Sequence, residues 1–260
     1  MRTSWPALAA AIALLAAAGC SDDTTETNPD GAVADAPAAD SVAYPDLGGL
    51  PDLPVQGKCD SEWRDAISPQ KSVSKGAVTT TVVSGVNQTE IDATAGGMSS
   101  AHKNPWVYVS LRDGGKRVEI DDFAARTSTA WDLALRRSVI RINGGDSSKV
   151  GQGAVAIVIS TTLDKVSSVP PSSQFAQDDF LDDKCAILRN PINNIRTAFG
   201  GANGMWYQYD TGQMKLTPNP DSYVVRSGDG KQHFKLYINT YYDPSTGAGA
   251  HFNVSWGELK

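Results

Sequence analysis

The sequence WDLALRRSVIRINGG, at residues 131–145, decides the fold because it joins two strand-like segments to a tight turn. Residues 131–137 and 140–142 have the length and composition that are typical of strands. Residues 143–145, Asn-Gly-Gly, supply the positive φ angles that a tight turn demands. The stretch therefore predicts two consecutive strands that end in a turn.

Two side chains in this stretch are interpreted as structural. Trp131 stands at a strand start and is expected to be a core aromatic. Asp132 is expected to accept hydrogen bonds from a neighbouring turn, and the sequence offers it no apparent acid/base partner.

A period of two dominates the rest of the domain. Residues 106–111 alternate, and Asp113-Gly114-Gly115 turns the chain into 116–121, which is a hairpin signature. The run 154–159 is typical of a buried strand, and 223–226 leads through a glycine-rich turn into another long strand. No repeat of about 20 to 50 residues is visible, which disfavours propellers and solenoids. These patterns predict one all-β domain.

Residues 184–199 are the only stretch with plausible helix signals. An acidic cluster precedes them, Gly200-Gly201 follows them, and Pro191 limits the length of any helix there. We therefore predict at most one short helix.

The N-terminus has the composition of a bacterial secretory signal. Arg2 precedes an apolar run, 5–19, that is too short to span a bilayer comfortably. The run ends in Ala-Ala-Gly directly before Cys20, which looks like the lipobox where lipid is attached to the cysteine and the chain is cleaved ahead of it. We predict a signal peptide over 1–19 and lipidation of Cys20. An ordinary cleaved signal with an incidental cysteine is the alternative.

Residues 20–57 are predicted to form an acidic, proline-rich tether. The segment 21–57 contains five prolines, no Lys or Arg, and eight acidic residues: Asp22, Asp23, Glu26, Asp30, Asp35, Asp40, Asp46 and Asp52. Such a segment cannot bury a core, and proline stiffness with like-charge repulsion extends it. It should lift a folded domain off the membrane; an acidic recruitment site is the alternative.

The charge balance of the remaining chain argues against a nucleic-acid partner. The chain has 23 basic and 29 acidic residues, and leaving out Arg2 and the eight tether acids leaves 22 against 21. A nearly neutral domain without a Lys/Arg cluster lacks the electrostatic footprint of phosphate binding.

Residues 58–260 have the length of one domain with a sizeable core. After lipidation of Cys20, Cys59 and Cys185 are the remaining thiols, and an oxidising compartment gives them a single intramolecular pairing. We predict a disulfide between them; two buried free thiols are the alternative. Neither has a His or a second Cys at zinc-ligand spacing.

Three regions together resemble the HmuY family of bacterial haem-binding lipoproteins. They are the opening stretch 131–145; the segments 206–209, 216–218, 223–226, 229–231 and 234–236; and Tyr241-Tyr242-Asp243-Pro244 with the closing strand. The resemblance implies an all-β, two-sheet domain with projecting loops around a haem. It also implies an outer-membrane lipoprotein, on the cell surface or the periplasmic face, that captures haem for iron acquisition and passes it to an outer-membrane haem receptor. A host haemoprotein is a further possible partner.

In the family that this chain resembles, loops in the later half of the domain supply two axial ligands, His or Met. Two histidines from those loops cannot fill both positions here. No histidine occurs between His102 and His233. Strand alternation places His233 and His251 on faces opposite to the inferred core. If their strands form a hairpin, the two histidines are separated by about 26 Å at roughly 3.3 Å per residue. They cannot bind one iron.

Methionine is the better candidate ligand, because thioether sulfur is an established axial ligand of haem iron. Met205 and Met214 lie on either side of Trp206, Tyr207 and Tyr209, whose rings could stack on a porphyrin. The alternative is that these methionines fill gaps and the aromatics are ordinary packing. Met98 with His102 is a second candidate site, and a tyrosinate from Tyr207 or Tyr209 is a third.

The predicted function is non-catalytic haem binding by a lipoprotein held to the membrane through its lipid anchor only. Catalysis finds little support, since the chain has no Gly-x-Ser-x-Gly elbow, no Walker loop and no paired His spacing for zinc. The alternative is a surface or periplasmic interaction or structural module of the same fold that does not bind haem.

Overall fold

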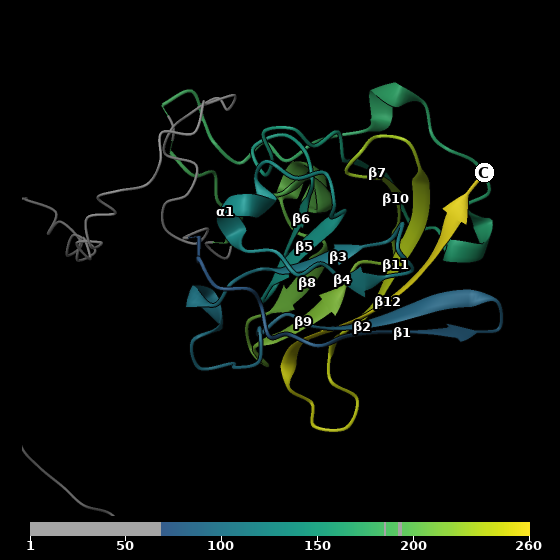
Figure 1. Cartoon of the computed structure of the whole chain (residues 1–260). Coiled ribbons are helices and arrows are strands. Elements are labelled where there is room, and N and C mark those ends of the chain that lie inside the picture. Colours follow the sequence, from purple (N-terminus) through teal and green to yellow (C-terminus); the bar gives the residue numbers. More distant parts are fainter. Residues whose placement is uncertain (1–68, 185, 192–193) are drawn as a thin grey trace, which may run out of the picture. The chain divides into compact units, whose positions relative to one another are not determined.

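The computed structural model describes residues 69–184, 186–191 and 194–260. The predicted signal peptide, tether and lipidated Cys20 lie outside the described residues, as do both Cys59 and Cys185. Three antiparallel sheets make up the described domain (Figure 1).

The largest sheet has six strands in the order β1-β2-β12-β11-β10-β7. Their bounds are β1 (Val78–Val83), β2 (Val86–Asp92), β7 (Ala154–Val158), β10 (Ser222–Arg226), β11 (His233–Tyr242) and β12 (Gly249–Leu259). The predicted strands at 154–159 and 223–226 are therefore present, and the latter pairs with β11 as the glycine-rich turn indicated.

A second sheet has four strands in the order β4-β3-β5-β6, and a third has two. Their bounds are β3 (Val107–Ser110), β4 (Lys116–Arg117), β5 (Leu133–Arg136), β6 (Val139–Ile142), β8 (Tyr207–Asp210) and β9 (Lys215–Pro218). The hairpin predicted from the alternation at 106–121 is the β3–β4 pair. The opening stretch forms β5 and β6, so the all-β prediction is confirmed.

Helices are short throughout the described residues. One α-helical turn, α1 (Asp122–Ala125), begins after Asp121, whose carboxylate accepts the N–H groups of Phe123 and Ala124 at 2.9 and 2.8 Å. The 3-10 turns are η2 (Ala101–Lys103), η3 (Leu163–Lys165), η4 (Ser172–Gln174) and η5 (Ala198–Asn203).

The helix predicted over 184–199 is wrong. The described residues there make isolated bridges, Leu181 with Ile187 and Arg189 with Ile195. Asp182 uses its carboxylate to accept the N–H groups of Lys184 and Ala186, so the acidic cluster closes a turn and does not start a helix. Of the described residues, none forms a helix with the length and apolar character needed to cross a bilayer.

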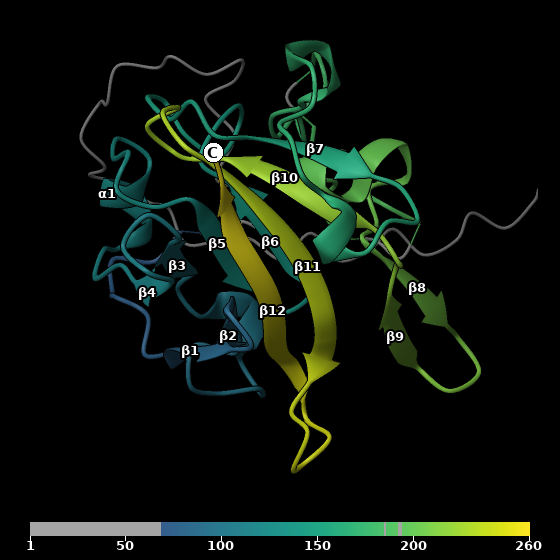
Figure 2. The same cartoon turned by 90° about the vertical axis from the view of Figure 1, so that its right-hand side faces the viewer.

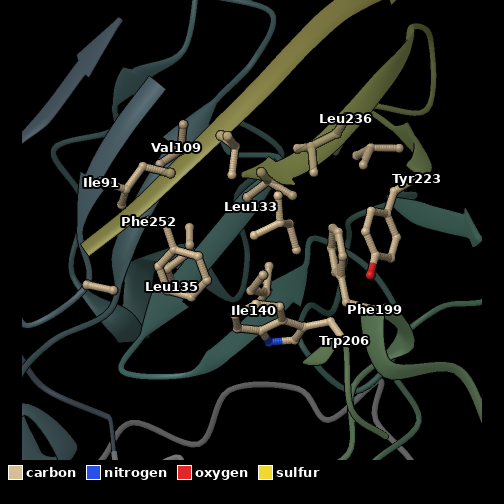
Figure 3. Close-up of a cluster of buried hydrophobic side chains, with 14 of the residues drawn as sticks. Ile91, Val109, Leu133, Leu135, Ile140, Phe199, Trp206, Tyr223, Leu236 and Phe252 are labelled. Carbon is tan, nitrogen blue, oxygen red and sulfur yellow. The ribbon is translucent and has the colours of Figure 1, made fainter. Parts of the chain in front are cut away.

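The main core lies between the two larger sheets. Inward residues of β11 (Phe234, Leu236, Ile238) and of β12 (Phe252, Val254, Trp256) are at most 3% exposed. Leu133 and Leu135 approach them from β5, as Figure 3 shows for Leu133, Leu135, Leu236 and Phe252. The alternation that was used to assign these strands therefore marks the true core face.

The motif stretch is buried and fully used by the fold. Trp131 is 0% exposed and its indole N–H donates to the carbonyl of Ala125 at 2.9 Å, so the core interpretation is confirmed. Gly145 has a φ of +62°. A Cβ on Gly144 would lie 2.1 Å from the carbonyl oxygen of Gly153, so that glycine is required by close approach of the backbone.

Asp132 accepts hydrogen bonds from two turns, whereas the sequence predicted hydrogen bonds from one neighbouring turn. Its Oδ2 accepts the Leu111 N–H at 2.7 Å, and its Oδ1 accepts the Gly228 N–H at 2.8 Å and the Arg112 Nε at 3.1 Å. Burial raises the pKa of Asp132, and the Gly228 N–H and the Arg112 charge oppose that rise. One carboxylate thus ties the turn after β3 to the turn after β10.

Candidate functional site

The segment that sequence analysis selected forms a hairpin that projects from the domain. Strands β8 and β9 pair from Tyr207–Pro218 to Asp210–Lys215, and they extend away from the six-stranded sheet (Figure 2). At the tip, Asp210 Oδ1 accepts the N–H groups of Gly212 and Gln213 at 2.8 and 3.1 Å. A short, exposed turn therefore closes the hairpin.

The base of the hairpin is fixed to the body by polar and aromatic contacts. The Trp206 indole N–H donates to the carbonyl of Ser138 at 2.8 Å, in the β5–β6 turn. The Leu216 N–H donates to Tyr242 Oη at 2.8 Å. The Trp206 ring also lies 5.2 Å from Phe252 and 6.2 Å from Tyr241 between centroids. Trp206 anchors the base and the Leu216 contact holds β9 one pair below the tip, so the tip turn extends beyond these contacts.

The three predicted aromatic residues differ in accessibility. Trp206 and Tyr207 are 2% and 3% exposed and belong to the main core, while Tyr209 is 36% exposed. Among the described residues, the Tyr207 hydroxyl is buried without a hydrogen-bond partner. Tyr209 is therefore the one of the three whose ring a ligand could reach in this conformation.

The two predicted methionine ligands lie at opposite ends of the hairpin. Met205 is half-buried against the core at the base, and Met214 is 79% exposed in the tip turn. The ladder extends to Trp206, whose carbonyl accepts the Asn219 N–H at 3.0 Å. Met205 and Met214 are thus about six positions apart along the hairpin, or about 20 Å at roughly 3.3 Å per residue. The structure does not bring the two sulfurs together.

Met214 has an unusual backbone. Its φ is +52°, in the left-handed region that a residue with a side chain occupies at some cost. A large apolar side chain is thus held in solvent at a conformation that glycine or asparagine would adopt more easily. Such outliers motivate a search for function at the position that holds them.

The other candidate donors are dispersed. His251 lies beside Asp92 on β2, whereas the His233 ring contacts Phe175 at 5.6 Å and its pKa is lowered by burial and by Arg226. The β11–β12 pairing keeps the two histidines apart, as the sequence predicted. Met98 and His102 are both exposed in one loop. Within the described ranges, no group of three or more His, Cys, Asp or Glu could hold a metal ion.

Three residues that hold the hairpin to the body were not predicted from the sequence: Tyr241, Tyr242 and Ser138. Burial raises the pKa of Tyr241 to about 12, so its hydroxyl stays protonated. The adjacent aromatics at the end of a strand were a signal for this anchoring, but the Ser138 carbonyl could not be identified, because a backbone acceptor leaves no mark in the sequence.

Comparisons with solved structures return proteins that are described as HmuY-like. Among solved structures, the apo HmuY analogue of Tannerella forsythia matches at 16% identity and a TM-score of 0.47, over 71% of this chain and 97% of that one. A Bacteroides vulgatus protein with a HmuY-like haem-binding designation matches at 15% identity and a TM-score of 0.41, over 66% and 90% of the two chains. A comparison with curated proteins finds no significant match.

The family assignment comes from a sequence comparison. The family model described as HmuY protein matches residues 102–256, which is more than half of the chain and includes the motif stretch, the hairpin and the closing strands. This chain therefore belongs to the HmuY family.

Proposed function

We propose that this protein binds haem without transforming it, and that the tip of the β8–β9 hairpin supplies the binding groups. Membership of the HmuY family supports haem as the ligand. The observation that carries the choice of site is Met214, which is 79% exposed at a φ of +52°. A thioether held in solvent at this conformational cost has no packing role to explain it.

The chemistry of the hairpin suits a flat iron macrocycle. Thioether sulfur is an established axial ligand of haem iron, so Met214 would take that role. Tyr209 shares a face of β8 with the buried Tyr207 but is partly exposed. Its ring would contact the porphyrin edge. Trp206 and Tyr207 would support this surface from the core, and Met205 would pack at the base.

The membrane placement is part of the same proposal. Lipid on Cys20 would anchor the protein to the outer membrane, and residues 20–57 would extend the domain from it. A disulfide between Cys59 and Cys185 would fix the end of that tether to the domain. From this position the domain would take up haem, from a host haemoprotein or from solution, and pass it to an outer-membrane receptor.

A haemin titration of the purified protein tests the binding. We expect a saturable change in the Soret band, which Met214→Ala weakens and Tyr209→Ala weakens less. Met205→Ala is the matched control, because the same side chain is removed at the base of the same hairpin. A titration without a saturable change in the Soret band would overturn haem binding. Equal binding by all variants would overturn only the choice of site.

A second candidate is the same fold acting as an interaction module without haem. The observation in its favour is the separation of Met205 from Met214, which leaves one exposed sulfur on the hairpin. The two candidates differ in the titration, since this one predicts no saturable binding in the wild type.

A further inference from the structure

The six-stranded and four-stranded sheets protect their edges, except along β1. On the six-stranded sheet, the outer side of β7 is paired with a loop: Val155 N–H donates to Ala176 O at 2.8 Å, and Ala176 N–H donates back at 2.9 Å. This edge therefore has no open ladder at its centre.

Both edges of the four-stranded sheet are also protected. Strand β4 is only two residues long, and both of them, Lys116 and Arg117, are basic. On the outer side of β6, the Ile142 N–H donates to the buried carboxylate of Asp178 at 2.9 Å. Short length, charge and covering are the usual devices that prevent edge-to-edge association.

Strand β1, at the other edge of the six-stranded sheet, has none of these devices. It consists of three valines and three threonines over Val78–Val83, without a charge or a proline. It lies at the edge of the sheet, where β2 is its one neighbouring strand in the sheet order (Figure 1). β-Branched residues favour strand pairing, so this edge is suited to pair with a further strand.

The hairpin turn determines which backbone groups of β1 face outward. Ser84 and Gly85 have φ values of +51° and +79°, so a two-residue turn joins Val83 to Val86. In such a hairpin the closing pair is hydrogen-bonded and the bonded pairs then alternate. The Asp92 N–H, which donates to Ala77 O at 2.8 Å, fits this alternation.

Thr80 and Val82 therefore direct their N–H and C=O groups away from β2. In the part of the chain that the structure describes, no backbone group bonds to them on that side. The side chain of Val82 is 70% exposed and that of Val83 is 46% exposed. The outer half of β1 thus combines an open ladder with exposed apolar side chains.

We propose that β1 is an association edge, on which a second copy of this chain adds its own β1 antiparallel to the first. A twofold axis at Thr81 would place Thr80 of each copy opposite Val82 of the other. The outward N–H and C=O groups of both residues would then be paired, and Val82 would be partly covered. The six-stranded sheet would continue across the axis.

A second copy fits this edge better than the chain's own N-terminal segment does. Residues 21–57 carry eight acidic residues and five prolines, and both residue types disfavour strand pairing. The β1 strand of another copy has no charge, so two such edges meet without like-charge repulsion.

Sedimentation velocity over a concentration series of the purified full chain tests the proposal. We expect the wild type to shift from monomer to dimer as concentration rises. Val82→Lys should raise the dissociation constant by about tenfold or more, because it places a charge at the contact. Val82→Pro should do the same while it keeps the side chain apolar, because it removes an outward N–H and no bond to β2.

Ile159→Lys is the matched control. Ile159 is 75% exposed just after β7, at the opposite edge of the same sheet, so this variant should associate as the wild type does. Circular dichroism verifies that each variant is folded.

A wild type that stays monomeric throughout would overturn the proposal, even if β1 bound a different extended chain. Association that both Val82 variants retain would also overturn it. Loss of association in Val82→Lys but not in Val82→Pro would indicate an apolar contact without strand pairing, which is equally contrary to it.

Discussion

Asp132 and Asp210 do the same local work in two regions of opposite character. Each carboxylate accepts hydrogen bonds from backbone N–H groups of a turn, Asp132 in the buried motif stretch and Asp210 at the exposed hairpin tip. Asp132 is 0% exposed and joins two distant turns, whereas Asp210 caps only its own. The motif stretch therefore maintains the fold, whereas the hairpin tip presents its groups to solvent.

Replacing these two carboxylates should separate the regions most strongly. Asp132→Ala leaves the N–H groups of Leu111 and Gly228 buried without an acceptor, so we expect a loss of about 3–5 kcal/mol in the free energy of unfolding. Asp210→Ala, as the matched control, should cost about 1 kcal/mol or less, because water replaces the acceptor. Urea denaturation of both variants measures the difference, and equal losses would contradict the distinction.

The pH dependence of stability should come partly from the buried region. Burial raises the pKa of Asp178 from 3.8 to about 6, so the folded state binds this proton more tightly than the unfolded state does. The stabilisation is complete below the unfolded pKa and is lost as pH rises through about 6. Relative to Asp178→Asn, the wild type should lose on the order of 2–3 kcal/mol between about pH 4 and pH 7.

Asp243, an exposed carboxylate whose pKa is shifted in the opposite direction, provides the control. The hydroxyl and N–H groups of Ser245 and Thr246 lower the pKa of Asp243 in the β11–β12 turn. Its contribution is present above the unfolded pKa and is lost in acid, so Asp243→Asn should reduce the acid-side loss of stability. Denaturation curves at several pH values measure both slopes. A wild type that gains stability relative to Asp178→Asn as pH rises would contradict the first prediction.

At the hairpin base, Tyr207→Phe should raise stability by about 1 kcal/mol. The variant keeps the ring in the core and removes a buried hydroxyl that has no partner among the described residues. Thermal denaturation measures the gain. Tyr242→Phe is the control and should lose stability, because the Tyr242 hydroxyl accepts the Leu216 N–H.

At the tip, Met214→Gly should raise stability slightly, by about 0.5–1 kcal/mol, because glycine adopts a φ of +52° without steric cost. Met214→Leu keeps the Cβ and the exposed apolar chain, so its stability should match that of the wild type. If haem binding depends on the sulfur, both variants should bind haem more weakly, although only Met214→Gly changes the stability. Parallel denaturation and haemin titrations measure both properties.

Local patterns predicted most of the fold. The strands of the motif stretch, the β3–β4 hairpin and the inward faces of β11 and β12 follow from alternation and turn residues, which are read within a few positions. The prediction that Asp132 accepts hydrogen bonds from a neighbouring turn is confirmed by the Leu111 N–H. The second turn that Asp132 contacts, at Gly228, lies 96 positions away and could not be predicted.

Non-local contacts explain what sequence analysis missed. Residues 184–199 are flanked by helix start and stop signals, but Leu188 donates its N–H to Phe180 O at 2.7 Å, and bonds of this kind keep the described residues there out of a helix. Trp206 and Tyr207 were expected to face a ligand, yet contacts with Ser138 and Phe252, distant in sequence, place Trp206 in the core. The positive φ of Met214 was not predicted, because the sequence alone did not determine the length of the turn at the hairpin tip.

The near-infrared spectrum of the ferric haem complex tests the proposed role of Met214 most directly. A thioether bound to ferric haem gives a charge-transfer band in this region. We predict that the wild type and Met205→Ala show this band and that Met214→Ala loses it. A wild-type complex without the band, or a Met214→Ala complex that retains it, would contradict the assignment of the hairpin tip as the haem site.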